Sequence, residues 1–409
     1  MNNLLTSKKH LFTRIAIGFA LGIVMGLILP EISIQTKFIG DIYLNLIQMM
    51  IIPVIFVAVA GGIINIGSAQ DLGRIGLKSV LVFAVMFVAT AAIGLITSYL
   101  VRPGNRITVD PVGFEEEVTT PSVQEFFMNV VPDNIFQAVS DGAILPTIIF
   151  TLLFSVAIVA VGKEAEPVKI FLNSLSKVIF KILDFVMELT PIGVLSLMAF
   201  AIAEYGAGIF SALGLYIITA WSACIIAFII VMLLPVWLYT GLPPNEFIKG
   251  IYKVWLVSLS TTSSAVTLPT NMRVNINDFK APASITNFVV PLGTTINMAG
   301  GAISFSLLAV FVSDFYQIPL SVAEIIYLVA IATILNMAAP GIPGGGIVLG
   351  ASFLTLLGLP IELMGPIAAI YRLLDMAYTT MNVTGDAAAN LLISKSEEKR
   401  THKRTLIEE

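Results

Sequence analysis

Long apolar segments are the feature that most constrains what this chain can fold into. A helix needs about 20 consecutive apolar residues to cross the hydrocarbon core of a bilayer. Eight segments of the sequence are apolar over a comparable length: Leu11–Leu29, Ile39–Ile66, Val80–Leu100, Ile144–Val161, Val168–Ala201, Leu213–Tyr239, Ile285–Phe311 and Ile367–Ile393. Because lipid offers the backbone no hydrogen-bonding partner, such segments must be helical. The sequence predicts an all-α polytopic membrane protein with eight transmembrane helices.

Composition excludes several classes of protein. Of the 409 residues 57% are hydrophobic and 12% charged, whereas a soluble domain has about 25% charged residues. This argues against a soluble enzyme and a disordered chain, and the net charge of -4 provides no basic surface for nucleic acid. The single cysteine, Cys224, excludes a disulfide framework and a cysteine-based metal site.

The distribution of cations predicts the orientation in the membrane. Lys and Arg are concentrated before the first segment, between the second and third, and after the last, whereas the loop at 102–125 contains three successive glutamates. Cytoplasmic loops carry the excess of Lys and Arg. We therefore expect a multi-pass protein of the cell membrane with both termini in the cytoplasm. The first segment has no small-residue cleavage site after it and is interpreted as a span.

Two polar interruptions predict re-entrant helical hairpins. The sequences "SLSTTSSAVTLPTNMRV" and "ILNMAAPGIPGGGIVLG" are each flanked by apolar arms too short to cross a bilayer. We place hairpin 1 at about 244–277 and hairpin 2 at about 321–359. Each precedes a span with polar residues, and the glycine-rich sequence at Pro291–Ile303 should interrupt the first of these. Such repeats, with discontinuous helices meeting near the midplane, are typical of secondary transporters.

The last span contains the clearest candidate site. Asp375, Thr379, Asn382 and Asp386 follow one another at helical spacing and so share one face. Ionisable residues inside a span usually face a cavity or a partner, and we interpret both aspartates as functional. For Arg372, three residues before Asp375, the favoured interpretation is a structural ion pair with that aspartate.

The motifs "TTSSAVTLPTNMR", "PLGTTINMAG", "APGIPGGG" and "LLDMAYTTMNVTGD" occur in the order found in the dicarboxylate/amino acid:cation symporter family, which the whole chain resembles. The resemblance implies a homotrimer in the lipid bilayer with an elevator mechanism, and not an enzyme. It implies a scaffold domain formed mainly by 1–70 and 102–205, a transport domain formed mainly by 71–101 and 206–394, and a cytoplasmic tail at 395–409.

The resemblance also implies a substrate site. Asp375 would bind a substrate ammonium group, and Asn382 with the hairpin 1 tip would bind the α-carboxylate. The residues implied to bind substrate are Ser263, Ser264, Gly344, Gly345, Gly346, Asp375, Tyr378, Thr379 and Asn382. Acidic amino acid carriers of the family have arginine where this chain has Tyr378, and threonine where it has Gly301.

Those two departures predict a neutral amino acid substrate of the serine, threonine or alanine type, with Tyr378 closing the side-chain end of the site. The alternative is an acidic amino acid or C4-dicarboxylate symporter, coupled to sodium or protons.

Sodium is the coupling ion that the resemblance implies, and no cofactor is expected. The residues implied to bind sodium, in part through backbone carbonyls, are Gly293, Thr295, Asn297, Met298, Asn382 and Asp386. A third family site needs an aspartate where this chain has Ala299, and hydroxyl partners where it has Phe83, Met86 and Phe87. We therefore expect fewer coupled ions than in the acidic amino acid carriers.

The sequence argues against two other classes of membrane protein, an intramembrane protease and a passive channel. A serine-type intramembrane protease needs a basic partner such as histidine, and both histidines are near the termini. Asp375 and Asp386 are 11 positions apart on one helix, about 16 Å, so they cannot share a proton as an aspartyl dyad. A passive channel would not need a pocket for a zwitterion.

Overall fold

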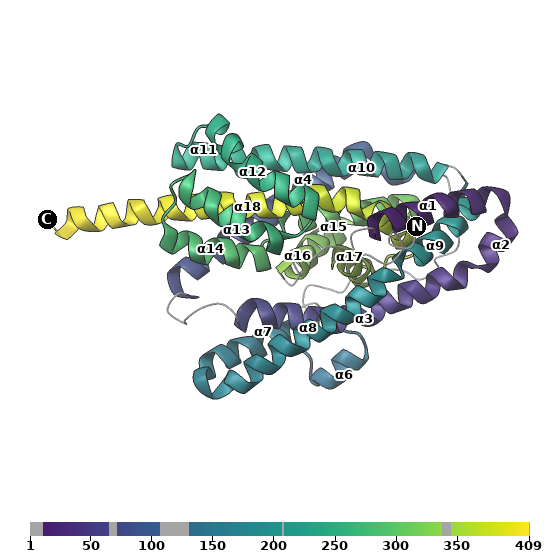
Figure 1. Ribbon diagram of the computed structural model, residues 1–409, viewed down its shortest axis with the longest axis horizontal. Helices are drawn as coiled ribbons and strands as arrows, with labels where there is room; N and C mark the ends of the chain where they lie inside the picture. Colours follow the sequence, from purple (N-terminus) through teal and green to yellow (C-terminus); the bar gives the residue numbers. More distant parts are fainter. Residues whose placement is uncertain (1–10, 65–71, 107–130, 207, 338–344, 409) are drawn as a thin grey trace, which may run out of the picture.

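The computed structural model describes residues 11–64, 72–106, 131–206, 208–337 and 345–408. Throughout these ranges the ordered secondary structure is helical, as the long apolar segments predict (Figure 1). By length and composition, the described residues contain five helical segments able to cross a membrane: Pro30–Gly61, Arg74–Asn105, Pro146–Glu188, Gly208–Thr240 and Ala283–Tyr316. Shorter apolar helices supplement them, so the eight predicted spans do not each correspond to one such segment.

One predicted span is divided in the structure. The segment Val168–Ala201 was expected to be one span, and at its length a tilted or broken helix was expected; in the structure α8 (Glu166–Glu188) ends before Leu189 and α9 (Thr190–Tyr205) begins directly after it. Pro191 lies in the first turn of α9, where the missing amide hydrogen costs no helical hydrogen bond. The division agrees with the expectation that spans of this length are tilted or broken, although apolar length alone does not show where the boundary falls.

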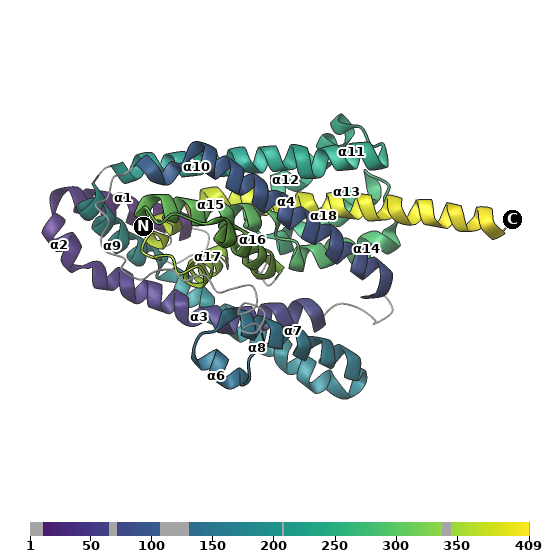
Figure 2. The same cartoon turned by 180° about the vertical axis from the view of Figure 1, so that it is seen from behind.

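One group of helices is built around α3 (Lys37–Ile64). This helix packs against α7 (Ile144–Val161), α8 and α9, and α1 (Leu11–Ile28) packs against α9. In Figures 1 and 2, α7, α8 and the short α6 (Ile135–Ser140) lie on the opposite side of the molecule from α10 (Gly208–Ala227). The short α2 (Pro30–Gln35) connects α1 to α3.

Close contact between α1 and α9 depends on three glycines four residues apart. A β-carbon added to Gly18 would lie 2.3 Å from the Pro191 carbonyl oxygen. The corresponding distance from Gly22 to the Leu195 oxygen is 2.6 Å, and Gly26 meets the next turn of α9 in the same way. Small residues at this spacing let two membrane helices approach until their backbones touch. The spacing of glycine at every fourth position is visible in the sequence of the first apolar segment, although no helix contact was predicted from it.

A second group of helices surrounds α18 (Met364–Glu408), which runs through the middle of the views in Figures 1 and 2. Five helices that pack against it are α12 (Pro244–Thr261), α13 (Ser264–Asn277), α14 (Ala283–Ile296), α15 (Ala299–Tyr316) and α17 (Gly345–Leu356). The remaining helices of this group are α4 (Leu77–Val101), α10, with η5 (Phe228–Leu233) and α11 (Leu234–Thr240) continuing it, and α16 (Val322–Met337).

Broken helices meet beside the middle of α18. Thr262 and Ser263 separate α12 from α13, and Asn297 and Met298 separate α14 from α15. The second interruption confirms that the glycine-rich sequence breaks this helix, since Asn297 has φ -98 and ψ 88. Residues 338–344, which include most of the predicted hairpin 2 tip, lie outside the described residues. The interruptions leave helix ends, with their free backbone groups, inside the protein.

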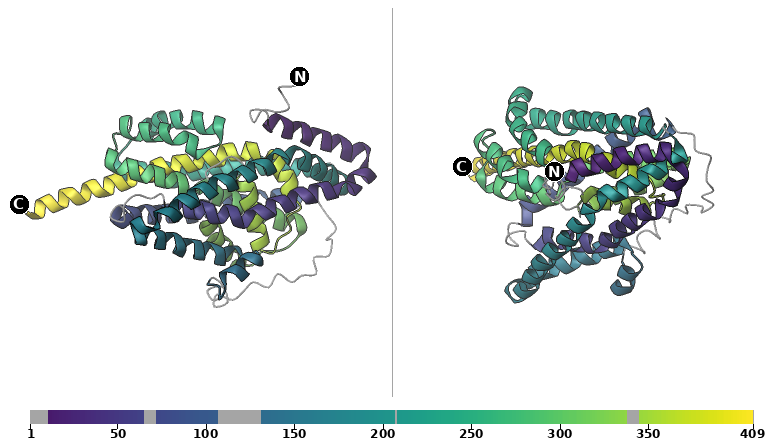
Figure 3. Two further views of the ribbon diagram at one scale, coloured as in Figure 1. Left: turned by 60° about the horizontal axis from the view of Figure 1, so that its bottom comes forward. Right: turned by 45° about the vertical axis from the view of Figure 1, so that its right-hand side comes forward.

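The C-terminal part of α18 extends beyond the apolar span. The helix continues past Ile393 to Glu408 and projects from the rest of the molecule (Figure 3). Shortly after Ile393, the Glu397 carboxylate pairs with Arg74 and, at 2.6 Å, with Lys78 Nζ. These ion pairs connect the beginning of the predicted tail to the N-terminal end of α4.

Candidate functional site

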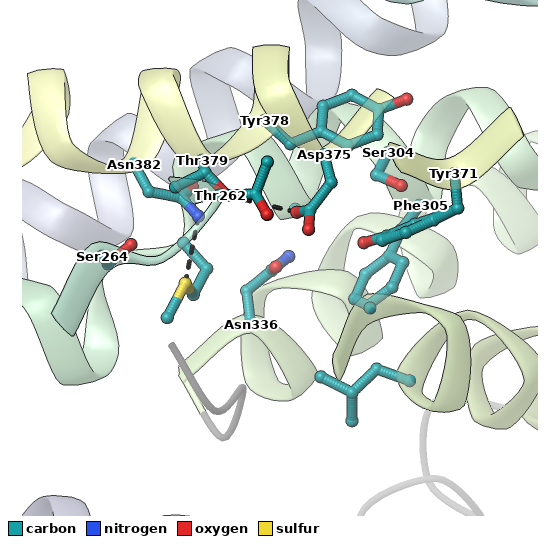
Figure 4. A pocket seen from close by; sticks show the side chains of 14 residues that line it. Thr262, Ser264, Ser304, Phe305, Asn336, Tyr371, Asp375, Tyr378, Thr379 and Asn382 are labelled. Atoms are coloured by element: carbon teal, nitrogen blue, oxygen red, sulfur yellow. Dashed lines mark hydrogen bonds between the residues drawn. The ribbon is translucent and has the colours of Figure 1, made fainter. Parts of the chain in front are cut away.

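A small cavity lies where the broken helices meet α18 (Figure 4). Fourteen residues line it: Thr262, Ser264, Met298, Gly301, Ser304, Phe305, Asn336, Gly346, Leu349, Tyr371, Asp375, Tyr378, Thr379 and Asn382. They come from both predicted hairpins, from α15 and from α18. Six of the predicted substrate residues are among them: Ser264, Gly346, Asp375, Tyr378, Thr379 and Asn382.

α18 supplies the polar side of the cavity. The Thr379 hydroxyl donates to Asp375 Oδ1 at 3.1 Å, which orients the carboxylate. One turn further on, Asn382 Oδ1 accepts from the Gly300 amide at 2.7 Å, while its Nδ2 lies 3.1 Å from Met298 Sδ. A thioether is a weak acceptor, so the Nδ2 donor is available for exchange to a stronger acceptor such as a carboxylate.

The N-terminus of α13 supplies the opposite charge. Ser263 is the N-cap of this helix, and its hydroxyl accepts from the Val266 amide at 3.3 Å. Ser263 is buried beside the cavity-lining Ser264. The positive end of the helix dipole and its unpaired amides favour an anion here. The cavity therefore has a carboxylate on one side and an anion-attracting helix end on another.

Hairpin 2 approaches the cavity through Gly346. A β-carbon added there would lie 1.8 Å from the Tyr371 hydroxyl oxygen, so a side chain at this position would displace that tyrosine. Of the other predicted glycines, Gly345 begins α17. Gly344 falls outside the described residues.

The two tyrosines of α18 have different orientations. The Tyr371 hydroxyl points into the cavity, whereas the Tyr378 hydroxyl points away from its middle, although Tyr378 still lines the wall (Figure 4). The ring of Tyr378 forms part of the wall, whereas its hydroxyl is not turned toward the middle of the cavity for a hydrogen bond to a substrate side chain. Only the packing of α18 against its neighbours decides which hydroxyl faces inward.

Several cavity residues were not predicted from the sequence. Asn336 belongs to α16, and its amide points toward the middle of the cavity (Figure 4). Ser304, Phe305 and Leu349 also line the wall. For Asn336 a signal existed, since it is a polar residue near the end of an apolar arm.

Arg372 lies outside the cavity wall and contacts hairpin 1. Its guanidinium donates to the Thr262 hydroxyl and, at 3.0 Å, to the Ser260 carbonyl oxygen. The expected structural role thus includes a contact between helices that the spacing from Asp375 did not reveal.

A second cluster of oxygen atoms surrounds Asp386, which is fully buried. Asn297 Nδ2 donates to Asp386 Oδ1 at 2.8 Å and lies 3.5 Å from the Asn382 carbonyl oxygen. The Thr294 hydroxyl lies 3.5 Å from Asp386 Oδ2. Gly293 is so close that an added β-carbon would be 2.4 Å from Asp386 Oδ1. The structure thus brings together Gly293, Asn297, Asn382 and Asp386, and it adds Thr294.

Hard oxygen ligands of this kind suit a small cation. Asn297 Oδ1 is buried and accepts no hydrogen bond from the described residues, so it is free to bind a cation. Met298 is buried next to the helix break, whereas Thr295 is exposed and its hydroxyl donates to the Leu292 carbonyl at 2.7 Å. The side chain of Thr295 therefore takes no part in the Asp386 cluster.

The positions that correspond to the third family ion site, which the sequence predicts to be missing, are packed with apolar side chains. Phe83, Phe87 and Ala299 have no exposed surface, and Met86 is 3% exposed. All four belong to the hydrophobic core in which α4 packs against α15.

Comparisons with known proteins define the class. Residues 11–396 match the sequence profile described as "Sodium:dicarboxylate symporter family". The chain belongs to this family, whose members are transporters and not enzymes.

Curated relatives cover almost the whole chain. A "Proton/sodium-glutamate symport protein" of Geobacillus stearothermophilus is 30% identical over 402 residues, covering 95% of each chain. A "C4-dicarboxylate transport protein" of Brucella anthropi is 31% identical over 398 residues, covering 95% of this chain and 89% of the relative. These similarities support cation-coupled symport in a membrane.

Proposed function

We propose that the protein is a sodium-coupled symporter for a small neutral amino acid. The observation that carries this proposal is the charge of the cavity. Asp375 lines it, and among the lining residues that the structure describes there is no lysine or arginine. An amino acid brings an ammonium group for Asp375 and an α-carboxylate for Asn382 and the N-terminus of α13.

A second carboxylate on the substrate would be poorly matched. It would lie near Asp375 with no cationic side chain in the wall to pair with it. An unpaired charge in a site closed from water costs several kcal/mol. A dicarboxylate without an ammonium group would also leave Asp375 without a partner. The wall therefore favours a zwitterion with an uncharged side chain.

The second candidate is an acidic amino acid or a C4-dicarboxylate, coupled to sodium or protons. The names of the relatives favour it, since one is a proton/sodium-glutamate symport protein and the other a C4-dicarboxylate transport protein. Arg372 is the cation that would serve this role, since it contacts Thr262 and Thr262 lines the cavity.

Sodium is proposed as the coupling ion because the Asp386 carboxylate lies beside the Thr294 hydroxyl oxygen and near the Asn382 carbonyl oxygen, which are neutral oxygen atoms. The substrate residue Asn382 also contributes its carbonyl oxygen to the vicinity of Asn297. A cation at Asp386 would hold the same turn of α18 that faces the substrate, which provides a physical link between the two binding events.

The remaining assignments follow from the resemblance to the symporter family. We propose a homotrimer in the cell membrane with both termini in the cytoplasm and an elevator movement of the transport domain. Residues 71–101 and 206–394 would move relative to 1–70 and 102–205. The glycine-mediated contact of α1 with α9 lies within the proposed scaffold.

The test is uptake into proteoliposomes with an imposed sodium or proton gradient. Labelled serine, threonine and alanine should accumulate with a sodium gradient, and aspartate, glutamate and succinate should compete weakly. Asp375→Asn should abolish uptake, because the neutral amide no longer balances the ammonium group. Asp278→Asn, which removes one partner of an exposed ion pair with Lys253, is the matched control and should transport normally. Uptake of glutamate or succinate in preference to serine would support the second candidate.

A further inference from the structure

Asn336 is the polar residue of the cavity wall that the proposed function leaves without a role. It lies near the C-terminal end of α16, and its side chain is buried, with 1% exposure. In Figure 4 its amide group points toward the Asp375 carboxylate. The side chain therefore faces whatever part of a ligand extends beyond the groups bound by Asp375 and Asn382.

The orientation of the Asn336 amide is determined by its neighbour on α16. Nδ2 donates to the Ala332 carbonyl oxygen at 2.6 Å. A carbonyl oxygen can only accept, so the nitrogen faces Ala332 and Oδ1 lies on the side of Gly301, which also lines the cavity. Oδ1 is buried and accepts no hydrogen bond from any residue that the structure describes. The cavity wall thus presents a fixed acceptor.

Gly301 provides the space for this acceptor. A β-carbon added at Gly301 would lie 2.0 Å from Asn336 Oδ1, so any side chain there would push the amide out of its place. Gly301 and Asn336 both line the cavity, one from α15 and the other from α16. Because Gly301 has no side chain, the Asn336 amide oxygen occupies the space beside α15 and places a hydrogen-bond acceptor there.

We propose that Asn336 determines substrate specificity by accepting a hydrogen bond from the substrate's side chain. The inference rests on the proposed function, and it narrows the substrate class to amino acids whose side chain carries a hydroxyl or amide donor. A side-chain carboxylate would place its oxygen against another acceptor. An aliphatic side chain of the same shape would leave Oδ1 buried without a partner, which costs about 1–3 kcal/mol.

Threonine and valine form the most direct test, since they have the same shape and differ in the hydroxyl group. The wild-type protein should bind threonine about tenfold to a hundredfold more tightly than valine, as expected for a buried acceptor left unpaired. In Asn336→Leu, which removes the acceptor but keeps much of the volume, this ratio should fall to about one. Because the ratio compares two ligands on one preparation, it is independent of the folded fraction.

Two further variants complete the experiment. Asn336→Ala serves as a second variant if Asn336→Leu fails to fold, and it should also lower the ratio. Asn105→Leu makes the same change at an exposed position outside the cavity and should leave the ratio as in the wild type. Competition of threonine and of valine against uptake of labelled serine in proteoliposomes measures both ligands.

The outcomes separate the inference from the proposed function. If alanine, serine and threonine are all refused, both are overturned. If these amino acids are transported but the wild type accepts threonine and valine equally, only the inference is overturned. The inference alone is also overturned if Asn336→Leu keeps the wild-type ratio of threonine to valine affinity and changes only the sodium dependence of uptake. The Asn336 amide would then be a cation ligand.

Discussion

The guanidinium of Arg372 on α18 donates hydrogen bonds both to the Thr262 hydroxyl and to the Ser260 carbonyl at the end of α12. Thr262 has φ 47, a left-handed conformation that is uncommon for a β-branched residue. Its hydroxyl also donates to the Thr261 carbonyl at 2.8 Å. Arg372 therefore holds an unfavourable backbone conformation at the point where hairpin 1 enters the cavity.

Arg372→Ala should loosen the tip of hairpin 1 and weaken substrate binding by about tenfold, since bonds from a charged donor contribute about 1.5–3 kcal/mol. Thr262→Gly should reduce the effect of the arginine substitution, because glycine adopts positive φ without strain. Substrate affinity in the two single variants and the double variant measures this coupling.

Lys253→Ala is the control for the arginine substitution, because Lys253 is on α12, the helix whose C-terminal end Arg372 contacts, and pairs with Asp278 at the surface. It should bind substrate like the wild type. Additive effects of Arg372→Ala and Thr262→Gly would show that the two residues act independently and would contradict the interpretation.

Gly293→Ala should impair the cation site with little effect on the helix. The new methyl group would lie 2.4 Å from Asp386 Oδ1, in the space next to the carboxylate. We expect the sodium concentration for half-maximal uptake to rise by about tenfold or more, because the ligands must separate. Gly214→Ala on α10 is the matched control, since an added β-carbon there meets no atom within 4 Å. An unchanged sodium dependence in Gly293→Ala would rule out a cation bound beside Asp386.

Gly22→Val should destabilise the contact between α1 and α9. Its β-carbon would lie 2.6 Å from the Leu195 carbonyl oxygen, so the helices would have to move apart. Overpacking of this kind costs about 1–3 kcal/mol, and it should lower the thermal unfolding temperature of the purified protein in detergent. Leu21→Val, at a position with 52% exposure on the same helix, should leave that temperature nearly unchanged. Equal unfolding temperatures for the two variants would argue against tight packing at Gly22.

Helical periodicity explains why part of the candidate site was predictable. Asp375, Thr379, Asn382 and Asp386 lie on one face of any α-helix at this spacing. Polar residues in an apolar span must face a cavity or a partner, so the function of this face could be inferred without a structure. The break between α14 and α15 was predictable because glycines follow Asn297 in an otherwise apolar segment.

Contacts between helices distant in sequence were not predictable in this way. The Arg372 contact with Thr262 joins residues 110 positions apart, and the spacing of Arg372 from Asp375 suggested a different partner. The boundary between α8 and α9 was missed because both helices belong to one long apolar segment, although Pro191 was a possible signal.

The sequence by itself determined the membrane location, the helical class and the polar face of α18, because these depend on composition and on the repeat of a single helix. Tertiary structure alone decided that the Tyr371 hydroxyl, and not that of Tyr378, enters the cavity (Figure 4). It alone decided that Asn336 occupies the space above Gly301. The physical reason is that side-chain direction at a site built from several broken helices depends on how those helices rotate and pack against one another, which no local pattern contains.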